Sequence, residues 1–192
     1  MSYPTPNFSL DLSGDVAIVT GTTSGLGKRF AQILAACGAS VVLTGRRVEK
    51  LEELAEEIRA NGGICEPIAT DMTDRESIRN MVNAAEAKFG TINILINNAG
   101  VPDAQRAVRM SDDLIDSVVD TNLVGPYVLS CEIAKRLMAE KKPGRIVNIS
   151  SIAAFNTSPG SAAALYSITK SGVVRMTEAL SVEWSKFRIN VN

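Results

Sequence analysis

The chain has 192 residues, of which 45% are hydrophobic and 21% are charged, and this composition predicts one soluble globular domain with a buried core. The net charge of -1 gives no long-range attraction to nucleic acid or to acidic membranes, and no apolar run reaches the roughly 18 residues that a membrane span needs. The sequence contains no histidine, which excludes a Ser-His-Asp triad and any histidine-ligated metal site.

Short β-branched runs alternate with longer amphipathic segments along the chain. The expected strands are residues 15–20, 40–44, 64–69, 92–96 and 145–149, with a last strand that begins near residue 188. Residues 48–61 carry apolar side chains at helical spacing and end at a Gly-Gly pair, and Thr73 or Asp74 can cap the next helix. Alternation of this kind predicts an α/β fold, a doubly wound parallel sheet with helices on both faces. We expect a single domain over residues 1–192, with 1–12 as a loose tail.

A glycine-rich turn, TGTTSGLG at residues 20–27, joins the first strand to a helical segment. Strand, glycine-rich turn and helix in this order place a pyrophosphate at a helix N-terminus. Gly21 permits the tight turn, Gly25 allows close approach of the phosphates, and Gly27 allows the helix to pack closely on the strand. An ordinary glycine-rich loop is the alternative. We predict dinucleotide contacts from Gly21, Thr23, Ser24, Gly25, Leu26 and Gly27.

The second strand ends in Thr44-Gly45-Arg46-Arg47. An acidic residue at this distance binds the ribose 2′-hydroxyl of NAD, whereas an arginine suits the 2′-phosphate of NADP. Glycine occupies the acid position here, and two arginines at the start of a helix oppose its dipole. We therefore predict that Arg46 and Arg47 bind NADP(H) in preference to NAD(H), which stays possible. A solvated basic loop balanced by nearby glutamates is the alternative.

Polar residues follow the third and fourth strands. Asp71, followed by Met72, can hydrogen-bond the adenine amino group, or it can cap the helix that begins nearby. The run NNAG at residues 97–100 places Asn98, Ala99 and Gly100 at the carboxyl end of a strand, where small and amide residues suit a cofactor crevice. An asparagine-rich turn is the alternative for this run.

Asn122 lies in a long helical stretch, residues 112–140, that also contains Gly125-Pro126. Proline lacks the N–H that would bond the carbonyl four residues earlier, and that carbonyl belongs to Asn122. We expect a kink that leaves this acceptor to bind a water molecule. A kink satisfied by solvent alone is the alternative.

Tyr166 and Lys170 stand one helical turn apart, so the phenol and the ammonium share a face. A nearby fixed cation favours the phenolate, which allows a tyrosine to transfer a proton at neutral pH. Taken alone, this spacing is more often a solvated helix face. Ser150 and Ser151 close the fifth strand, where a hydroxyl can bond a substrate oxygen or simply form a turn.

Together, TGTTSGLG (20–27), Asp71, NNAG (97–100), Asn122, Ser150-Ser151 and YSITK (166–170) resemble the short-chain dehydrogenase/reductases, in a pattern similar to gluconate dehydrogenases and 3-oxoacyl reductases. The resemblance implies reversible hydride transfer between C4 of a nicotinamide and a carbonyl or secondary alcohol. It implies a tetrad in which Tyr166 transfers the proton, Lys170 favours the phenolate and holds ribose hydroxyls, Ser151 polarises the carbonyl and Asn122 fixes a relay water. Ser151 is preferred to Ser150 as the second residue after the Asn-Ile pair.

The resemblance also sets expectations for the rest of the molecule. Members of this family continue beyond the sixth strand into a substrate-binding region, so we expect this chain to lack that C-terminal part. We expect residues 153–165 to line one wall of the substrate pocket, with a longer loop at 156–160. Dimers or tetramers would pack the helices around 112–140 and 162–186. The apolar residues available for that interface, or for the core, are Val118, Val119, Leu123, Val173, Val174 and Leu180.

Two other readings remain open at the level of the sequence. A non-catalytic, redox-sensing relative could use the same dinucleotide pocket, although it would have no need of both Tyr166 and Lys170. An inactive truncated form is the other. Cys37, Cys65 and Cys131 form no CxxC pair, so neither a disulfide framework nor a zinc site is indicated, and we expect a cytoplasmic protein without a bound metal.

Overall fold

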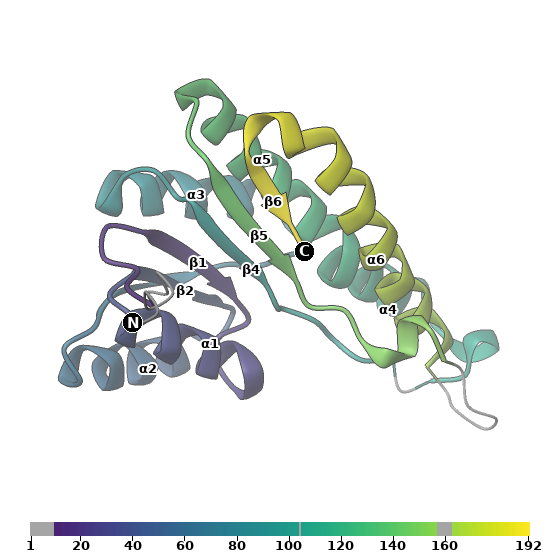
Figure 1. The fold of residues 1–192 in the computed structure, drawn as a ribbon. Coiled ribbons are helices and arrows are strands. Elements are labelled where there is room, and N and C mark those ends of the chain that lie inside the picture. The colour runs from purple at the N-terminus through teal and green to yellow at the C-terminus, as the bar shows by residue number, and fades with distance from the viewer. Residues whose placement is uncertain (1–9, 104, 157–162) are drawn as a thin grey trace, which may run out of the picture.

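The computed structural model describes residues 10–103, 105–156 and 163–192. Its centre is a six-stranded, wholly parallel sheet in the order β3-β2-β1-β4-β5-β6 (Figure 1). The strands are β1 (Val16–Thr20), β2 (Ser40–Gly45), β3 (Ile64–Ala69), β4 (Ile94–Asn97), β5 (Gly144–Asn148) and β6 (Ile189–Val191). The chain turns in opposite directions from β1 and β4, so the switch point of the sheet lies between these two strands.

Helices cover both faces of the sheet. Helices α1 (Gly25–Ala36) and α2 (Val48–Ala60) bury a core cluster against one face, and α3 (Arg75–Phe89), α5 (Gly125–Glu140) and α6 (Ala164–Trp184) bury a larger cluster against the other. Helix α4 (Asp112–Val119) and a π-helical turn (Asp120–Val124) lead into α5. Short 3₁₀ turns lie at Ala107–Arg109, Ile152–Ala154 and Ser185–Phe187. The doubly wound α/β fold expected from the sequence is confirmed.

The expected element boundaries agree with the structure to within two residues at all six strands. The fourth strand begins at Ile94, later than expected, and the side chain of the preceding Asn93 bonds the start of β1. Its Oδ1 accepts from the Val16 N–H at 2.9 Å, and its Nδ2 donates to Asp15 at 2.6 Å. Of the expected tail, residues 10–12 are described, and Leu12 packs against the core cluster beneath α1 and α2.

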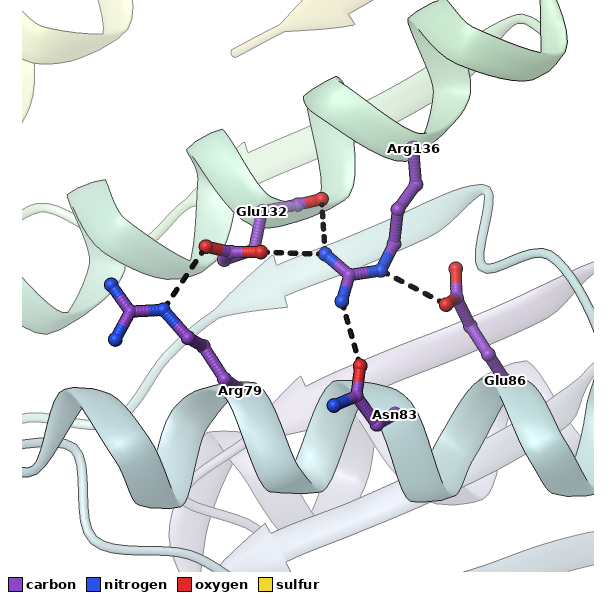
Figure 2. A network of polar contacts seen from close by, with 5 residues as sticks. All are labelled: Arg79, Asn83, Glu86, Glu132 and Arg136. Carbon is purple, nitrogen blue, oxygen red and sulfur yellow. Dashed lines mark hydrogen bonds and ion pairs between the residues drawn. The ribbon is translucent and has the colours of Figure 1, made fainter.

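A polar network joins α3 to α5 on the outer side of the molecule (Figure 2). Arg136 donates to Glu86, Asn83 and Glu132, with the Nε–Glu86 bond at 2.9 Å, and Arg79 approaches Glu132 from the other side. Bonds to Arg136 and Arg79 hold the pKa of Glu132 below its usual value. The side chains of Glu132, Arg136 and Glu86 are 19%, 22% and 27% exposed. Because solvent screens partly buried ion pairs less than exposed ones, these pairs couple α3 to α5 more firmly than isolated surface pairs would.

No helix within residues 10–103, 105–156 and 163–192 is both long enough and apolar enough to cross a membrane. The central strands are buried along nearly their whole length, with all five residues of β1 excluded from solvent. Burial on both faces is what parallel sheets require. It leaves the carboxyl edge of the sheet, where the loops after β1, β2, β3, β4 and β5 meet, as the place where polar residues gather.

Candidate active site

The turn after β1 has the shape that its glycines predict. Gly21 and Gly25 have φ of 71° and 59°, in the left-handed region that favours glycine. A Cβ on Gly21 would lie 2.8 Å from Cα of Ala99, and a Cβ on Gly27 would collide with the carbonyl oxygen of Gly21. The turn therefore packs directly against the loop after β4, and it can do so only without side chains.

Thr20 and Asn98 lock these two loops together. The buried hydroxyl of Thr20 accepts from the backbone N–H groups of Asn98 and Ala99, each at 2.9 Å. In return, Nδ2 of Asn98 donates to the carbonyls of Thr20 and Gly21, at 2.9 and 3.2 Å. The side chain of Asn98 thus holds the glycine-rich turn in place. In the run NNAG, Asn98 therefore supports the site and is not only part of an asparagine-rich turn.

A cavity of about 490 Å³ lies along the carboxyl ends of β1, β2, β3 and β4. Its lining contains most of the residues expected to bind the dinucleotide: Gly21, Thr23, Ser24, Arg46, Arg47, Asp71, Met72, Asn98, Ala99 and Gly100. Helix α1 begins here, and Ser24 at its N-cap makes no side-chain bond to it, nor does its first turn contain an acidic residue. Among the described residues, the N–H groups at this N-terminus therefore have no capping side chain of their own, an arrangement that suits an anion.

Charged groups line the far end of the same cavity. Arg47 donates to the hydroxyl of Thr23, across the cavity from its own helix. Asp71 accepts from the N–H and the hydroxyl of Thr73, both at 2.9 Å, and these bonds together with Arg46 hold the pKa of Asp71 below its usual range. The cap of α3 is Asp74 rather than Thr73 or Asp71, so Asp71 is not needed for that task.

Tyr166 and Lys170 line a second cavity of about 350 Å³, together with Ile149 and Ser150. The ammonium of Lys170 lies 5.8 Å from the centre of the Tyr166 ring and donates to the carbonyl of Ile149 at 2.7 Å. Lys170 is 4% exposed, and burial lowers the pKa of its ammonium. Asn98, Gly100 and Val101 belong to the walls of both cavities, so the two cavities adjoin across one loop.

The two serines after β5 are used differently. Ser150 lines the second cavity, and its hydroxyl donates to the carbonyl of Lys170 at 3.0 Å. Ser151 accepts from the N–H of Ala153 at 3.2 Å, so its hydroxyl proton is not consumed by that bond. Ser151 therefore stays the predicted hydroxyl donor to a substrate oxygen. The expected loop at 156–160 lies mostly outside the described residues, as do 157–162 of the expected pocket wall.

Asn122 sits in the π-helical turn rather than in a simple kink. The N–H of Gly125 bonds back to Asp120, five residues earlier, which widens the helix just before Pro126. The side chain of Asn122 is 1% exposed and forms two bonds with the backbone of Val101: Oδ1 accepts from its N–H at 2.8 Å, and Nδ2 donates to its carbonyl at 2.9 Å. The water expected at its own carbonyl stays a prediction.

Three functional contacts were not foreseen from the sequence. Thr20 begins the run TGTTSGLG, but the pattern assigns no role to its side chain, because a threonine at a strand end is common. Asp103 accepts from the backbone N–H of Tyr166 at 2.9 Å across a separation of 63 residues, and no local pattern predicts such a contact. The bonds from Asn122 to Val101 also depend on a tertiary contact.

Among the residues that the structure describes, no group of three or more acidic or cysteine side chains could hold a metal ion.

A parallel sheet with a glycine-rich turn at its switch point and a polar cleft along its carboxyl edge defines a dinucleotide-binding α/β protein. A family model for the short chain dehydrogenases matches residues 15–192. The 3-oxoacyl-(acyl-carrier-protein) reductase of Rickettsia conorii is 34% identical over 183 residues, which cover 95% of this chain and 72% of that protein. The chain therefore belongs to the short-chain dehydrogenase/reductase family of NAD(P)-dependent oxidoreductases, which act on CH–OH groups and the corresponding carbonyls.

Solved structures agree with this assignment. A metagenomic short-chain oxidoreductase in complex with NADP superposes with a TM-score of 0.86 and 35% identity, covering 93% of this chain and 80% of that one. A putative NAD(P)-dependent gluconate 5-dehydrogenase from Beutenbergia cavernae, with bound NADP at low occupancy, gives a TM-score of 0.87 and 34% identity, covering 96% of this chain and 72% of that one. The family, the fold and the class of reaction expected from the sequence are confirmed.

The buried ammonium of Lys170 yields a test of the site's electrostatics. Its folded pKa lies below its ordinary value of 10.5 because of burial, so the unfolded chain binds a proton that the folded chain releases between these two pKa values. Within that window, the free energy of unfolding of the wild type should rise with pH relative to Lys170→Met. Urea unfolding at a series of pH values measures this difference. Parallel curves for the two proteins would contradict the buried-ammonium account.

Proposed function

We propose that this protein transfers hydride reversibly between NADP(H) and a small carbonyl compound or secondary alcohol, with Tyr166 as the general acid and base. The observation that carries the proposal is the placement of the two cavities. The cavity that holds Tyr166 and Lys170 adjoins the cavity at the glycine-rich turn, and the loop after β4 lines both. A dinucleotide extended along the carboxyl edge of the sheet can therefore present its reactive end to Tyr166.

The residues present fit such a cofactor. Gly21 and Gly27 let the glycine-rich turn pack against the loop after β4 without a collision, and the N-terminus of α1 faces the cavity beside that turn. A Cβ on Gly45 would lie 3.0 Å from Cγ2 of Thr23, so the position that holds an acid in NAD-type sites has little room for one. Arg46 and Arg47 line this end of the cavity instead, which favours the 2′-phosphate of NADP. NADP bound to two related structures agrees with this preference.

When bound, the dinucleotide supplies or accepts the hydride at C4 of its nicotinamide. In the direction of reduction, Tyr166 donates its phenolic proton to the carbonyl oxygen, and in oxidation it removes the proton from the alcohol. The ammonium of Lys170 stabilises the phenolate that results, and it has two N–H groups besides the one used on Ile149 for ribose hydroxyls. Ser151 donates a hydrogen bond to the reacting oxygen, and Asn122 fixes a water that relays protons.

Two readings compete with this one. A redox-sensing relative would bind the dinucleotide without turnover, but it would gain nothing from burying Lys170 beside Tyr166, because burial of an ammonium costs free energy. An inactive chain is the other reading, and a cavity already formed along the glycine-rich turn argues against it. Both readings predict no turnover, so activity separates them from the oxidoreductase.

The nucleotide preference is tested with arginine variants. Arg46→Ala and Arg47→Ala, alone and together, should raise the dissociation constant for NADPH by roughly tenfold or more, because a charge-assisted bond to the 2′-phosphate is lost. The constant for NADH should change by less than about threefold. Nucleotide fluorescence titration measures both, with the exposed Arg29→Ala of α1 as the control. Equal losses for the two nucleotides would show that the arginines do not read the phosphate.

The proton-transfer role is tested with Tyr166→Phe. Removal of the phenol should lower turnover by roughly 10²–10⁴-fold and leave the dissociation constant for NADPH nearly unchanged. Absorbance of NADPH with a panel of alcohols and carbonyl compounds measures turnover. The control is Arg29→Ala, at an exposed residue of α1 outside the lining of both cavities. A Tyr166→Phe variant as active as the wild type would exclude this role, and a wild type inactive on the whole panel would favour the redox-sensing relative.

We also propose that the chain forms dimers or tetramers through α5 and α6. An apolar groove of about 340 Å³ lies between the two helices. Its lining is Leu123, Val124, Tyr127, Gly172, Met176, Ala179 and Leu180. Of the six residues expected at the interface or in the core, Val118, Val173 and Leu180 are buried in this chain, so they serve the core first. Val119, Leu123 and Val174 are partly exposed.

A charge in this groove tests the interface. Ala179→Arg should shift the protein to monomers in sedimentation velocity, because it places a guanidinium in an apolar contact. The control is Ala60→Arg, the same substitution at the exposed end of α2, which should leave the oligomeric state unchanged. A wild type that sediments as a monomer at every concentration would refute the proposed assembly.

A further inference from the structure

Within the described part of the chain, helix α6, which carries Tyr166 and Lys170, receives no cap from its own N-cap position. Ala163 stands at its N-cap position and has no side chain that could accept a bond, and the first turn of the helix contains no acidic residue. The first N–H groups of a helix have no partner inside it. Two other helices are capped by the residue at their own N-cap position: Asp74 caps α3 and Ser111 caps α4.

The missing cap comes from the loop after β4. Oδ2 of Asp103 accepts from the backbone N–H of Tyr166, the third residue of α6, at 2.9 Å. Asp103 is 1% exposed, so a carboxylate is held beside the N-terminus of a 21-residue helix. The partial positive charge at this end of the helix stabilises an anion. The contact is a remote N-cap, supplied by a residue far away in the sequence.

Hydrogen bonds therefore hold both the backbone N–H and the backbone carbonyl of Tyr166. Asp103 holds its N–H, and the hydroxyl of Thr169 donates to its carbonyl at 2.8 Å. Thr169 in turn accepts from Nδ2 of Asn122 at 3.3 Å, and Asn122 bonds the backbone of Val101, two residues before Asp103. The loop 101–103 and the first turn of α6 therefore form one closed set of hydrogen bonds.

The remote cap is a costly way to stabilise a helix. A serine or threonine at position 163 would cap α6 without burying a charge. Asp103 instead loses most of its hydration, and its other oxygen, Oδ1, is buried with no hydrogen-bond partner in the described part of the chain, which costs free energy. Unlike a local cap, the remote cap bonds Tyr166 to the loop that lines both cavities.

We propose that Asp103 is a positioning residue that sets where Tyr166 stands relative to the loop after β4. The proposal rests on the proposed role of Tyr166 in proton transfer. Asp103 acts through the backbone of Tyr166, so its own carboxylate exchanges no proton with the substrate. A reacting pair held to within fractions of an ångström gains much of its rate from that placement.

Hydrogen exchange of the Tyr166 amide tests the cap without any need for a substrate. In Asp103→Ala, exchange at the start of α6 should become roughly tenfold faster, whereas Asp103→Asn should stay within about threefold of the wild type, because asparagine caps as well as aspartate. The matched control is Asp74→Ala, which removes the same kind of bond from α3, at 2.8 Å to Glu76, and should speed exchange only there. Unchanged exchange in Asp103→Ala, or an equal rise in Asp103→Asn, would overturn the proposal.

Turnover tests the consequence for Tyr166. With NADPH and a carbonyl compound that the wild type reduces, kcat of Asp103→Ala should fall roughly ten- to hundredfold, with the dissociation constant for NADPH unchanged and Asp103→Asn restoring kcat. Asp74→Ala should keep the wild-type kcat. Wild-type kcat in Asp103→Ala would overturn the positioning role, as would a parallel loss of NADPH affinity. If the wild type reduces no compound, the proposed function fails, while the exchange comparison still decides whether Asp103 caps α6.

Discussion

The loop that follows β4 is bonded to both halves of the cleft, and the rest of the site depends on it. Thr20 and Asn98 join the loop to the glycine-rich turn, Asn122 holds it at Val101, and Asp103 joins it to the first turn of α6. Because parallel strands end at a common edge, this loop lies at the switch point of the sheet. Cofactor placement and proton transfer therefore share one structural support.

The site is built at the expense of stability. Lys170 is buried with its pKa lowered, Asp103 is a buried carboxylate with one unpartnered oxygen among the described residues, and Gly21 and Gly25 hold left-handed conformations. Each feature costs free energy in a folded chain. Their concentration along one edge of the sheet is typical of a functional site, where local stability is sacrificed for placement. The apolar clusters on both faces of the sheet and the network around Arg136 stabilise the fold and offset this cost.

Local patterns predict what depends on local physics. The six strands, the tight turn at Gly21 and a helix cap at Thr73 or Asp74 follow from residue type and periodicity. The strands and the turn are observed, and the cap is Asp74. The π-helical turn at Asn122 was expected only as a kink, because proline specifies the lost bond but not how the helix adjusts. Contacts that close over long separations, such as Asp103 with Tyr166, leave no periodic trace in the sequence, so no pattern could predict them.

If one loop supports both halves of the cleft, binding of a ligand at one half must slow hydrogen exchange at the other half. Hydrogen exchange of the 192-residue chain, with and without saturating adenosine 2′,5′-bisphosphate, the half of NADP that does not reach Tyr166 and Lys170, measures this directly. We predict slower exchange in the glycine-rich turn at 20–27 and, through the loop after β4, also at 163–170 in the first turns of α6. Protection confined to the glycine-rich turn, with α6 unchanged, would contradict the account.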